Sequence, residues 1–137
     1  ILYFLNKKYI ENIDIFAKSF RRREGLSKNF KFKNFTNKPT LLKKKYDLII
    51  NASNAGMSRG NKINRNILRL VKKTKGVIDI VYNPLETDLL KEAEKHNIKS
   101  IGGLIMLVEQ AKPSFEIWSK KDIEIDDKIY RSLISKI

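Results

Sequence analysis

The sequence predicts an α/β fold built on a parallel sheet, and three observations support this prediction. The chain has 137 residues, of which 42% are hydrophobic, so it has enough apolar side chains to bury one core. Short apolar runs of strand length alternate with amphipathic stretches of helix length. Over residues 77–118 the order is strand, helix, strand, helix, which implies that the strands run parallel.

The first half of the chain is expected to contain three strands and two helical segments. Apolar side chains at helical spacing, alternating phenylalanines and the run Leu48, Ile49, Ile50 identify them. That run predicts a strand covered on both faces, as in a parallel sheet. In chain order the elements are a helix end at residues 1–10, a strand at 13–16, a basic helical segment at 18–26, a strand at 29–35 and a strand at 46–51.

The second half is expected to repeat strands and helices more regularly. Residues 51–61, which contain Gly56 and Gly60, are predicted as a loop. The helix that starts at Gly103 is predicted to be interrupted near Pro113, because proline disrupts a helix interior. The elements are a helix at 64–73, a strand at 77–81, a helix at 86–96, a strand at 98–101, a helix at 103–118 and a terminal helix at 126–137.

Composition and charge restrict the function classes. The net charge of +14 raises nucleic-acid binding as a hypothesis, but the lysines are spread along the whole chain and aromatic residues do not interleave with them. We therefore expect solvated basic faces, and a non-enzymatic basic nucleic-acid-binding module is the alternative. With no cysteine and one histidine, no metal site is expected. No apolar stretch is long enough to span a bilayer, so no membrane partner is expected.

Residues 77–118 contain the densest motif of the chain, VIDIVYNPLETDLLKEAEKHNIKSIGGLIMLVEQAKPSFEIW. This stretch resembles the C-terminal half of shikimate dehydrogenase, whose pattern is D-x-x-Y-N-P-x-x-T-x-L-L-x-x-A followed by G-L-x-M-L-V-x-Q-x-x-x-x-F-x-x-W. The matching residues are Asp79, Tyr82, Asn83, Pro84, Thr87, Leu89, Leu90, Ala93, Gly103, Leu104, Met106, Leu107, Val108, Gln110, Phe115 and Trp118.

The resemblance implies a cytoplasmic oxidoreductase that reversibly reduces 3-dehydroshikimate to shikimate with NADPH, in chorismate and aromatic amino-acid biosynthesis. It also implies that residues 1–137 are one partial NADP-binding Rossmann-like domain whose first strand and glycine-rich loop are missing. The chain starts with Ile1 rather than Met and is expected to be a fragment that lacks the N-terminal substrate domain. A homodimer is left open, and a related quinate or hydroxy-acid dehydrogenase is an alternative.

The expected cofactor is NADP. In a Rossmann unit, an acidic residue at the end of the second strand binds the ribose of NAD and would repel the additional phosphate of NADP. Here the strand at 13–16 is followed by a hydroxyl and several cations, which suit a dianionic phosphate. Ala17 stands where the family has asparagine. The predicted phosphate-side residues are Ala17, Lys18, Ser19, Phe20, Arg21 and Arg22.

The remaining site residues are expected at the carboxyl ends of later strands and on the helix that follows. The resemblance places Asn51, Ala52, Ser53, Ile80, Gly103 and Met106 beside the cofactor, and Tyr82 and Gln110 at the substrate. The structural alternatives are a strand-end turn at 51–53 and a plain core helix at 103–118. The core helix would explain Met106 but not Gln110, whose amide needs partners. No catalytic and no metal-binding residue is assigned.

Overall fold

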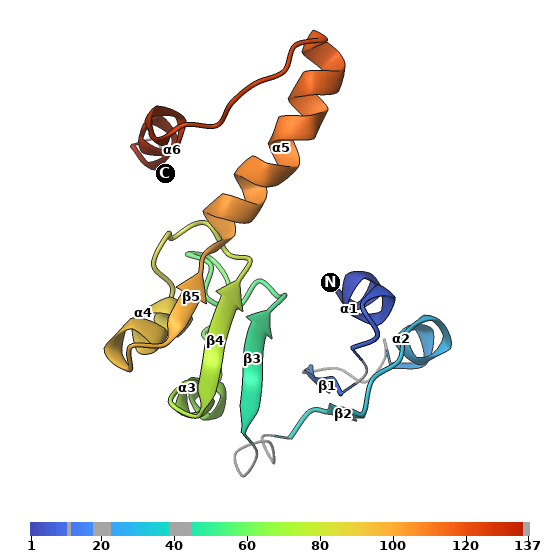
Figure 1. Cartoon of the computed structure of the whole chain (residues 1–137). Helices are drawn as coiled ribbons and strands as arrows, with labels where there is room; N and C mark the ends of the chain where they lie inside the picture. Colours follow the sequence, from blue (N-terminus) through green and yellow to red (C-terminus); the bar gives the residue numbers. More distant parts are fainter. Residues whose placement is uncertain (11, 18–22, 39–44, 136–137) are drawn as a thin grey trace. The chain divides into compact units, whose positions relative to one another are not determined.

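A computed structural model describes residues 1–10, 12–17, 23–38 and 45–135, and the chain forms two compact units, Ile1–Lys44 and Lys45–Ile137. Figure 1 follows the chain through its helices and strands. The predicted α/β class is confirmed, because the strands pair in parallel within each unit and alternate with helices. In the described ranges, no helix combines the length and the apolar character needed to cross a membrane.

The first unit pairs two short strands in parallel. Its elements are α1 (Leu2–Lys7), β1 (Asp14–Phe16), α2 (Arg23–Asn29) and β2 (Asn34–Thr36). Asp14 lies opposite Asn34 in the register, and the Asn34 amide donates to the Asp14 carboxylate at 2.6 Å. The Asn6 side chain attaches α1 to the connection before β2, because its amide donates to the Lys31 carbonyl and accepts from the Lys31 N–H.

The second unit is a three-stranded parallel sheet with helices. Its elements are β3 (Tyr46–Asn51), α3 (Arg65–Val71), β4 (Thr74–Asp79), α4 (Asp88–Lys95), β5 (Lys99–Ile101), α5 (Gly103–Ser119) and α6 (Asp127–Ile134). The strand order is β3-β4-β5, so β4 is central. Asn51 pairs with Asp79, and Ile78 pairs with Ile101, which brings the carboxyl ends of all three strands to one edge.

Helices α3 and α4 lie side by side and pack against β4, as Figure 1 shows. The core between them is formed by Ile63, Val71, Val77, Leu89 and Ala93, all of which are buried. These side chains come from α3, β4, α4 and the loop before α3. Burial of this apolar surface is the main stabilising contribution to the unit, and it keeps the strand ends in a fixed arrangement.

Three helices of this unit begin at side-chain caps. Asn64 accepts from the Asn66 N–H, Thr87 accepts from the Leu90 N–H, and Asp126 accepts from the Ile129 N–H. Each cap satisfies a backbone donor that has no partner inside the helix. Helix α5 instead begins after Gly102, without a side-chain cap, and its first N–H donates to the Val81 carbonyl.

Several sequence expectations about the strands need correction. The strand expected at 29–35 begins only at Asn34, because α2 continues to Asn29, whose amide donates to the Gly25 carbonyl. The strand expected at 77–81 runs from Thr74 to Asp79. The expectation that β3 is covered on both faces is also wrong, since none of its residues is fully buried and Leu48 is 43% exposed.

The predicted interruption of the long helix at Pro113 is wrong as well. Helix α5 continues through Pro113 to Ser119. Proline removes one backbone donor and crowds the carbonyl four residues earlier. Close to this point, the Ser114 hydroxyl donates to the Gln110 carbonyl at 3.4 Å, and the helix continues without a break.

Candidate functional site

The carboxyl ends of β3, β4 and β5 form the candidate site of the second unit. In open sheets of parallel strands, ligands bind outside these ends. β3 ends at Asn51, β4 ends at Asp79, and β5 is followed by the glycines that begin α5. The predicted residues from 51 to 53, from 80 to 82 and at the start of α5 therefore belong to one edge of one sheet (Figure 1).

Asn51 organises the loop that follows β3. Its amide donates to the Ala55 carbonyl and to the Asp79 carboxylate, both at 2.8 Å. Its amide oxygen accepts from the Ser53 N–H at 3.2 Å and from the Ser53 hydroxyl at 2.7 Å. Ala52 and Ser53 are exposed at this turn. The structural alternative of an ordinary strand-end turn therefore accounts for the Asn51 side chain, while the exposed residues stay available to a ligand.

Ile80 and Tyr82 follow the end of β4 instead of forming its last residues. Ile80 is half-buried, and its N–H donates to the Asn51 carbonyl at 3.2 Å. Tyr82 is 41% exposed. Directly after Tyr82, the Asn83–Pro84 peptide bond is cis. The Asn83 side chain accepts from the Ser58 hydroxyl at 3.2 Å. The loop after β3 and the turn after β4 are thus connected, and Tyr82 is exposed beside this connection.

Gly103 has a structural reason to be glycine. A Cβ at this position would lie 2.2 Å from the Ile80 carbonyl oxygen and 2.7 Å from the Val81 carbonyl carbon. No side chain fits there, because the neighbouring atoms are backbone atoms. The sequence suggested that a cofactor approaches Gly103. That role stays a prediction, and the contact with the turn after β4 already explains the residue.

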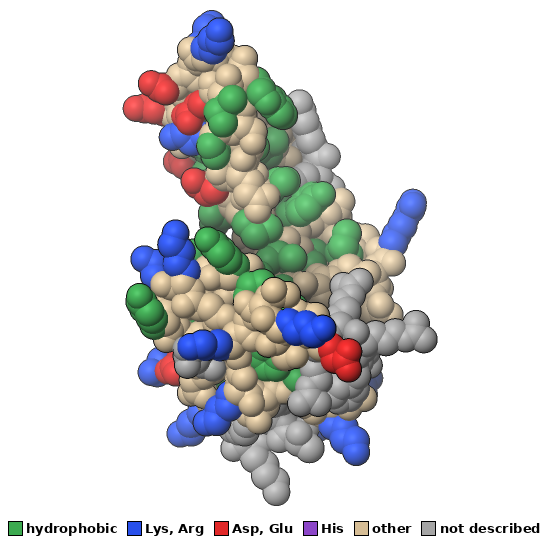
Figure 2. Space-filling model, turned by 90° about the vertical axis from the view of Figure 1, so that its right-hand side faces the viewer, with side chains coloured by type: hydrophobic (Ala, Val, Ile, Leu, Met, Phe, Trp, Pro, Cys, Tyr) green, Lys and Arg blue, Asp and Glu red, His purple; other side chains and the backbone are tan. Residues whose placement is uncertain are grey.

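Met106 and Gln110 lie on the exposed side of α5. Met106 is 36% exposed and Gln110 is exposed, whereas Leu104 and Val108 are buried. The core-helix alternative, which would bury Met106, is therefore not supported. Residues four apart lie on the same helix face, so Met106 and Gln110 present an apolar and an amide side chain together. Figure 2 shows apolar side chains among charged ones on the upper part of the molecule, the height at which Figure 1 shows α5.

Of the residues predicted on the phosphate side of the cofactor, the structure describes only Ala17. Ala17 follows β1, is half-buried, and its N–H donates to the Thr36 carbonyl at 3.0 Å. The other predicted residues, Lys18, Ser19, Phe20, Arg21 and Arg22, lie outside the described residues. Their assignment to the phosphate stays a prediction.

Sequence reasoning gave no role to two residues that are central to the observed geometry. Asp79 is fully buried and Thr87 is nearly so, and the Thr87 hydroxyl donates to the Asp79 carboxylate at 2.7 Å. Both residues belong to the motif, but the motif was used only for its resemblance. A carboxylate at the end of an apolar strand, followed by a threonine before a helix, is the signal that could have identified the pair.

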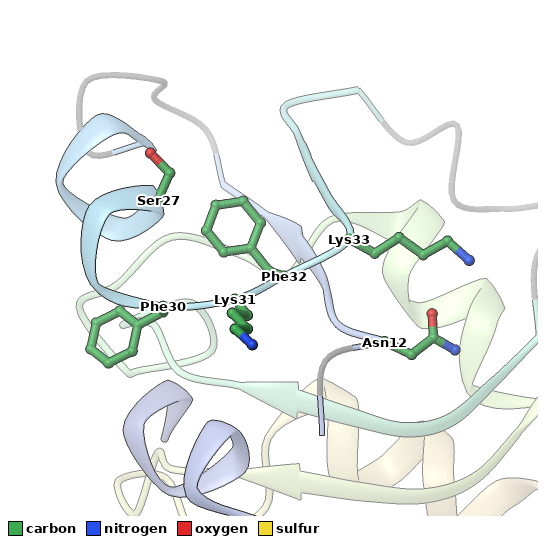
Figure 3. A pocket seen from close by; sticks show the side chains of 6 residues that line it. All are labelled: Asn12, Ser27, Phe30, Lys31, Phe32 and Lys33. Carbon is green, nitrogen blue, oxygen red and sulfur yellow. The ribbon is translucent and has the colours of Figure 1, made fainter. Parts of the chain in front are cut away.

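A hollow in the first unit is a poor candidate for the site. It has a volume of about 690 Å³ and is lined by Asn12, Ser27, Phe30, Lys31, Phe32 and Lys33. Figure 3 shows that these side chains come from the chain before β1, from α2 and from the connection to β2. The hollow therefore lies near the amino ends of the strands, whereas open parallel sheets bind ligands at the carboxyl ends.

The Lys75–Asp47 ion pair, whose two pKa values are shifted, also lies away from the candidate site. Lys75 Nζ is 2.6 Å from Asp47 Oδ1, and both side chains are 84% exposed. The hydrogen bond and the charge of Lys75 lower the pKa of Asp47, and Asp47 in turn raises the pKa of Lys75. Both residues are near the amino ends of β3 and β4, so this pair is a surface interaction. Among the described residues, no cluster of acidic and histidine side chains could hold a metal ion.

Comparison with known proteins identifies relatives of this chain. No family model matches it. A shikimate dehydrogenase (NADP(+)) of Methanococcus maripaludis is 38% identical over 135 residues, which cover 92% of this chain and 48% of that protein. The chain spans about half the length of the relatives it matches.

Solved structures agree with this similarity. A chorismate mutase/shikimate 5-dehydrogenase fusion protein from Clostridium acetobutylicum is 30% identical, with a TM-score of 0.79 over 98% of this chain and 49% of that chain. A shikimate dehydrogenase in complex with NADP+ is 31% identical, with a TM-score of 0.64 over 91% of this chain and 46% of its own. The family resemblance stated from the sequence is confirmed, and the nucleic-acid and hydroxy-acid alternatives are not favoured.

Proposed function

We propose that this chain, a relative of the shikimate dehydrogenases over about half of their length, is the cofactor-binding part of an NADP-dependent shikimate dehydrogenase. The observation that carries the proposal is the similarity to enzymes of that name over nearly the whole chain. The proposed reaction is the reversible transfer of a hydride between NADPH and the carbonyl carbon of 3-dehydroshikimate, with a proton added to the carbonyl oxygen.

The described residues fit the nicotinamide half of this cofactor. Asn51, Ser53 and Met106 belong to the strand ends and the helix where an open parallel sheet binds a dinucleotide. Ser53 and Met106 are exposed there, so a polar and an apolar side chain are both accessible. The bound cofactor would supply the hydride, Ser53 and Met106 would contact it, and Asn51 would hold the turn that carries Ser53. Lys18 and Arg21 are proposed to bind the 2′-phosphate.

Tyr82 and Gln110 are the proposed substrate residues of this chain. A phenol and an amide can both donate and accept hydrogen bonds, which suits a substrate with hydroxyl and carboxylate groups. Both side chains are exposed. We assign no proton-transferring residue to this chain, and we propose that a separate substrate-binding domain supplies it.

The exposed apolar residues of α5 support the proposal of a second domain. Phe115 is 48% exposed, Ile117 74% and Trp118 82%. A cluster of large apolar side chains on a surface is typical of a protein–protein contact. We propose that the substrate-binding domain covers this part of α5.

A cofactor titration tests the proposed function. In a protein that joins this chain to a substrate-binding domain, replacing Lys18 and Arg21 by alanine should weaken NADPH binding and leave NADH binding nearly unchanged. The loss should be at least about tenfold, because hydrogen bonds to charged groups contribute about 1.5–3 kcal/mol each. Lys28→Ala, which removes an exposed cation from the last turn of α2, is the matched control. Equal losses for both cofactors would show that these side chains do not bind the phosphate.

A further inference from the structure

The carboxylate of Asp79 is buried without a cationic partner among the described residues. Its side chain is 0% exposed. The ion pairs found in the described ranges are Lys75–Asp47, His96–Glu92 and Lys112–Glu116, and Asp79 takes part in none of them. A buried carboxylate is costly unless hydrogen bonds replace its hydration. Asp79 therefore depends on neutral donors around it.

Three such donors surround the carboxylate. Oδ1 accepts from the Asn51 amide at 2.8 Å and from the Val81 N–H at 3.1 Å, and Oδ2 accepts from the Thr87 hydroxyl at 2.7 Å. The three donors belong to the end of β3, the turn after β4 and the start of α4. One side chain thus connects the turn after β4 and the start of α4, which are near it in sequence, with the end of β3, which is 28 residues away.

We propose that Asp79 is a positioning residue that fixes the loop after β3 and the turn after β4. This inference rests on the proposed function, because these segments carry Asn51, Ser53 and Tyr82. A well-packed apolar residue would avoid the cost of burying a charge. What an apolar residue cannot do is accept three hydrogen bonds and so hold three chain segments in one arrangement.

The effect of Asp79 on the loop passes through the orientation of the Asn51 amide. A carboxylate only accepts hydrogen bonds, so Asn51 must turn its NH₂ group toward Asp79. The amide oxygen then faces the other way and accepts from the N–H and the hydroxyl of Ser53. The same NH₂ group donates to the Ala55 carbonyl, which closes the loop.

The effect on α4 passes through Thr87. Its hydroxyl donates its hydrogen to Asp79 and accepts from the Leu90 N–H at 3.3 Å, so one oxygen both holds the carboxylate and caps the helix. Serine keeps this hydroxyl, whereas valine has the shape of threonine without it. The pair Thr87→Ser and Thr87→Val therefore separates the hydrogen bond from the packing.

Limited trypsin digestion of the 137-residue chain tests the network without any substrate. Arg59 is exposed in the loop after β3, and Arg131 is exposed in α6 as a control site. Asp79→Asn and Thr87→Val should speed cleavage after Arg59 about tenfold, roughly the value of one hydrogen bond to a charged group, and leave cleavage after Arg131 unchanged. Thr87→Ser should stay within about twofold of the wild-type rate, since it keeps the donor. Equal acceleration at both arginines, or a serine variant as sensitive as the valine variant, would overturn the proposal.

Kinetics in a protein that joins this chain to a substrate-binding domain test the positioning role. Thr87→Val should raise KM for shikimate about tenfold while changing kcat less, and Thr87→Ser should leave KM near the wild-type value. A valine variant with wild-type KM would overturn the positioning role. If the wild-type protein does not oxidise shikimate with NADP, the proposed function fails, and the digestion pattern still decides whether Asp79 holds the loop.

Discussion

Gly103→Ala should destabilise the second unit, because the position has no room for a Cβ. The added carbon would lie 2.2 Å from the Ile80 carbonyl oxygen and 2.5 Å from the carbonyl carbon of the same residue. Since both are backbone atoms in a turn held by hydrogen bonds, α5 or the turn must move. Overpacking of this kind typically costs about 1–3 kcal/mol, and we expect the upper end. The higher helix propensity of alanine offsets at most about 1 kcal/mol.

The assay is thermal unfolding followed by circular dichroism, with two controls. A net loss of about 2 kcal/mol should lower the unfolding midpoint by about 8 °C or more in a unit of this size. Gly102→Ala should change the midpoint much less, because its Cβ would meet the flexible end of Leu90 at 3.3 Å and the Leu85 carbonyl oxygen at an ordinary distance of 3.9 Å. A Cβ at position 25 would have no atom within 4 Å, so Gly25→Ala should leave the midpoint unchanged or raise it. A Gly103→Ala midpoint equal to that of Gly102→Ala would refute the reasoning.

Three further outcomes are expected. Tyr82→Phe and Gln110→Ala, made in a protein that includes a substrate-binding domain, should reduce kcat/KM for shikimate more than they weaken NADPH binding, and wild-type kcat/KM would return both residues to a structural role. The 137-residue chain alone should not oxidise shikimate, since no proton-transferring residue is assigned to it, and turnover within about tenfold of a full-length relative would contradict this. Lys75→Met should raise the pKa of Asp47 toward its ordinary value in an NMR titration, because Lys75 lowers that pKa. Any stability that the pair contributes is fully present above the ordinary pKa of Asp47 and is lost as the pH falls from there through the lowered pKa. An unchanged titration would exclude the interaction.

The sequence predicted element types better than it predicted their boundaries. The strand at Tyr46–Asn51 was placed correctly, because its apolar run is bounded by polar residues. The next strand was placed too late, since Lys75 and Gly76 resemble turn residues, yet pairing with β3 extends it back to Thr74. It ends at Asp79 because that side chain accepts from the Val81 N–H, a contact that no periodicity contains.

The candidate site was predictable where it depends on strand ends and not where it depends on tertiary contacts. Asn51 and Tyr82 could be placed at neighbouring strand ends, because parallel strands align their carboxyl ends. The reason for glycine at 103 could not be deduced, since the neighbouring backbone of Ile80 comes from another segment. The role of Asp79 was only partly deducible: Thr87 and Val81 are near it in sequence, whereas the Asn51 donor comes from another strand.

The exposure of Met106 and Gln110 shows which of two stripes of α5 packs against the rest of the unit. In a helix, residues two positions apart are rotated by about 200° around the axis, so the stripe of Leu104 and Val108 faces away from the stripe of Met106 and Gln110. Apolar residues occur on both stripes, so the sequence alone cannot decide which one is buried. Tertiary packing decides it: Leu104 and Val108 are buried, whereas Met106 and Gln110 are exposed. Because a Cβ at position 103 would clash with the Ile80 carbonyl, Gly103→Ala should also displace the start of α5, and the displacement should change the NMR chemical shifts of the Gln110 side-chain amide as well as the unfolding midpoint.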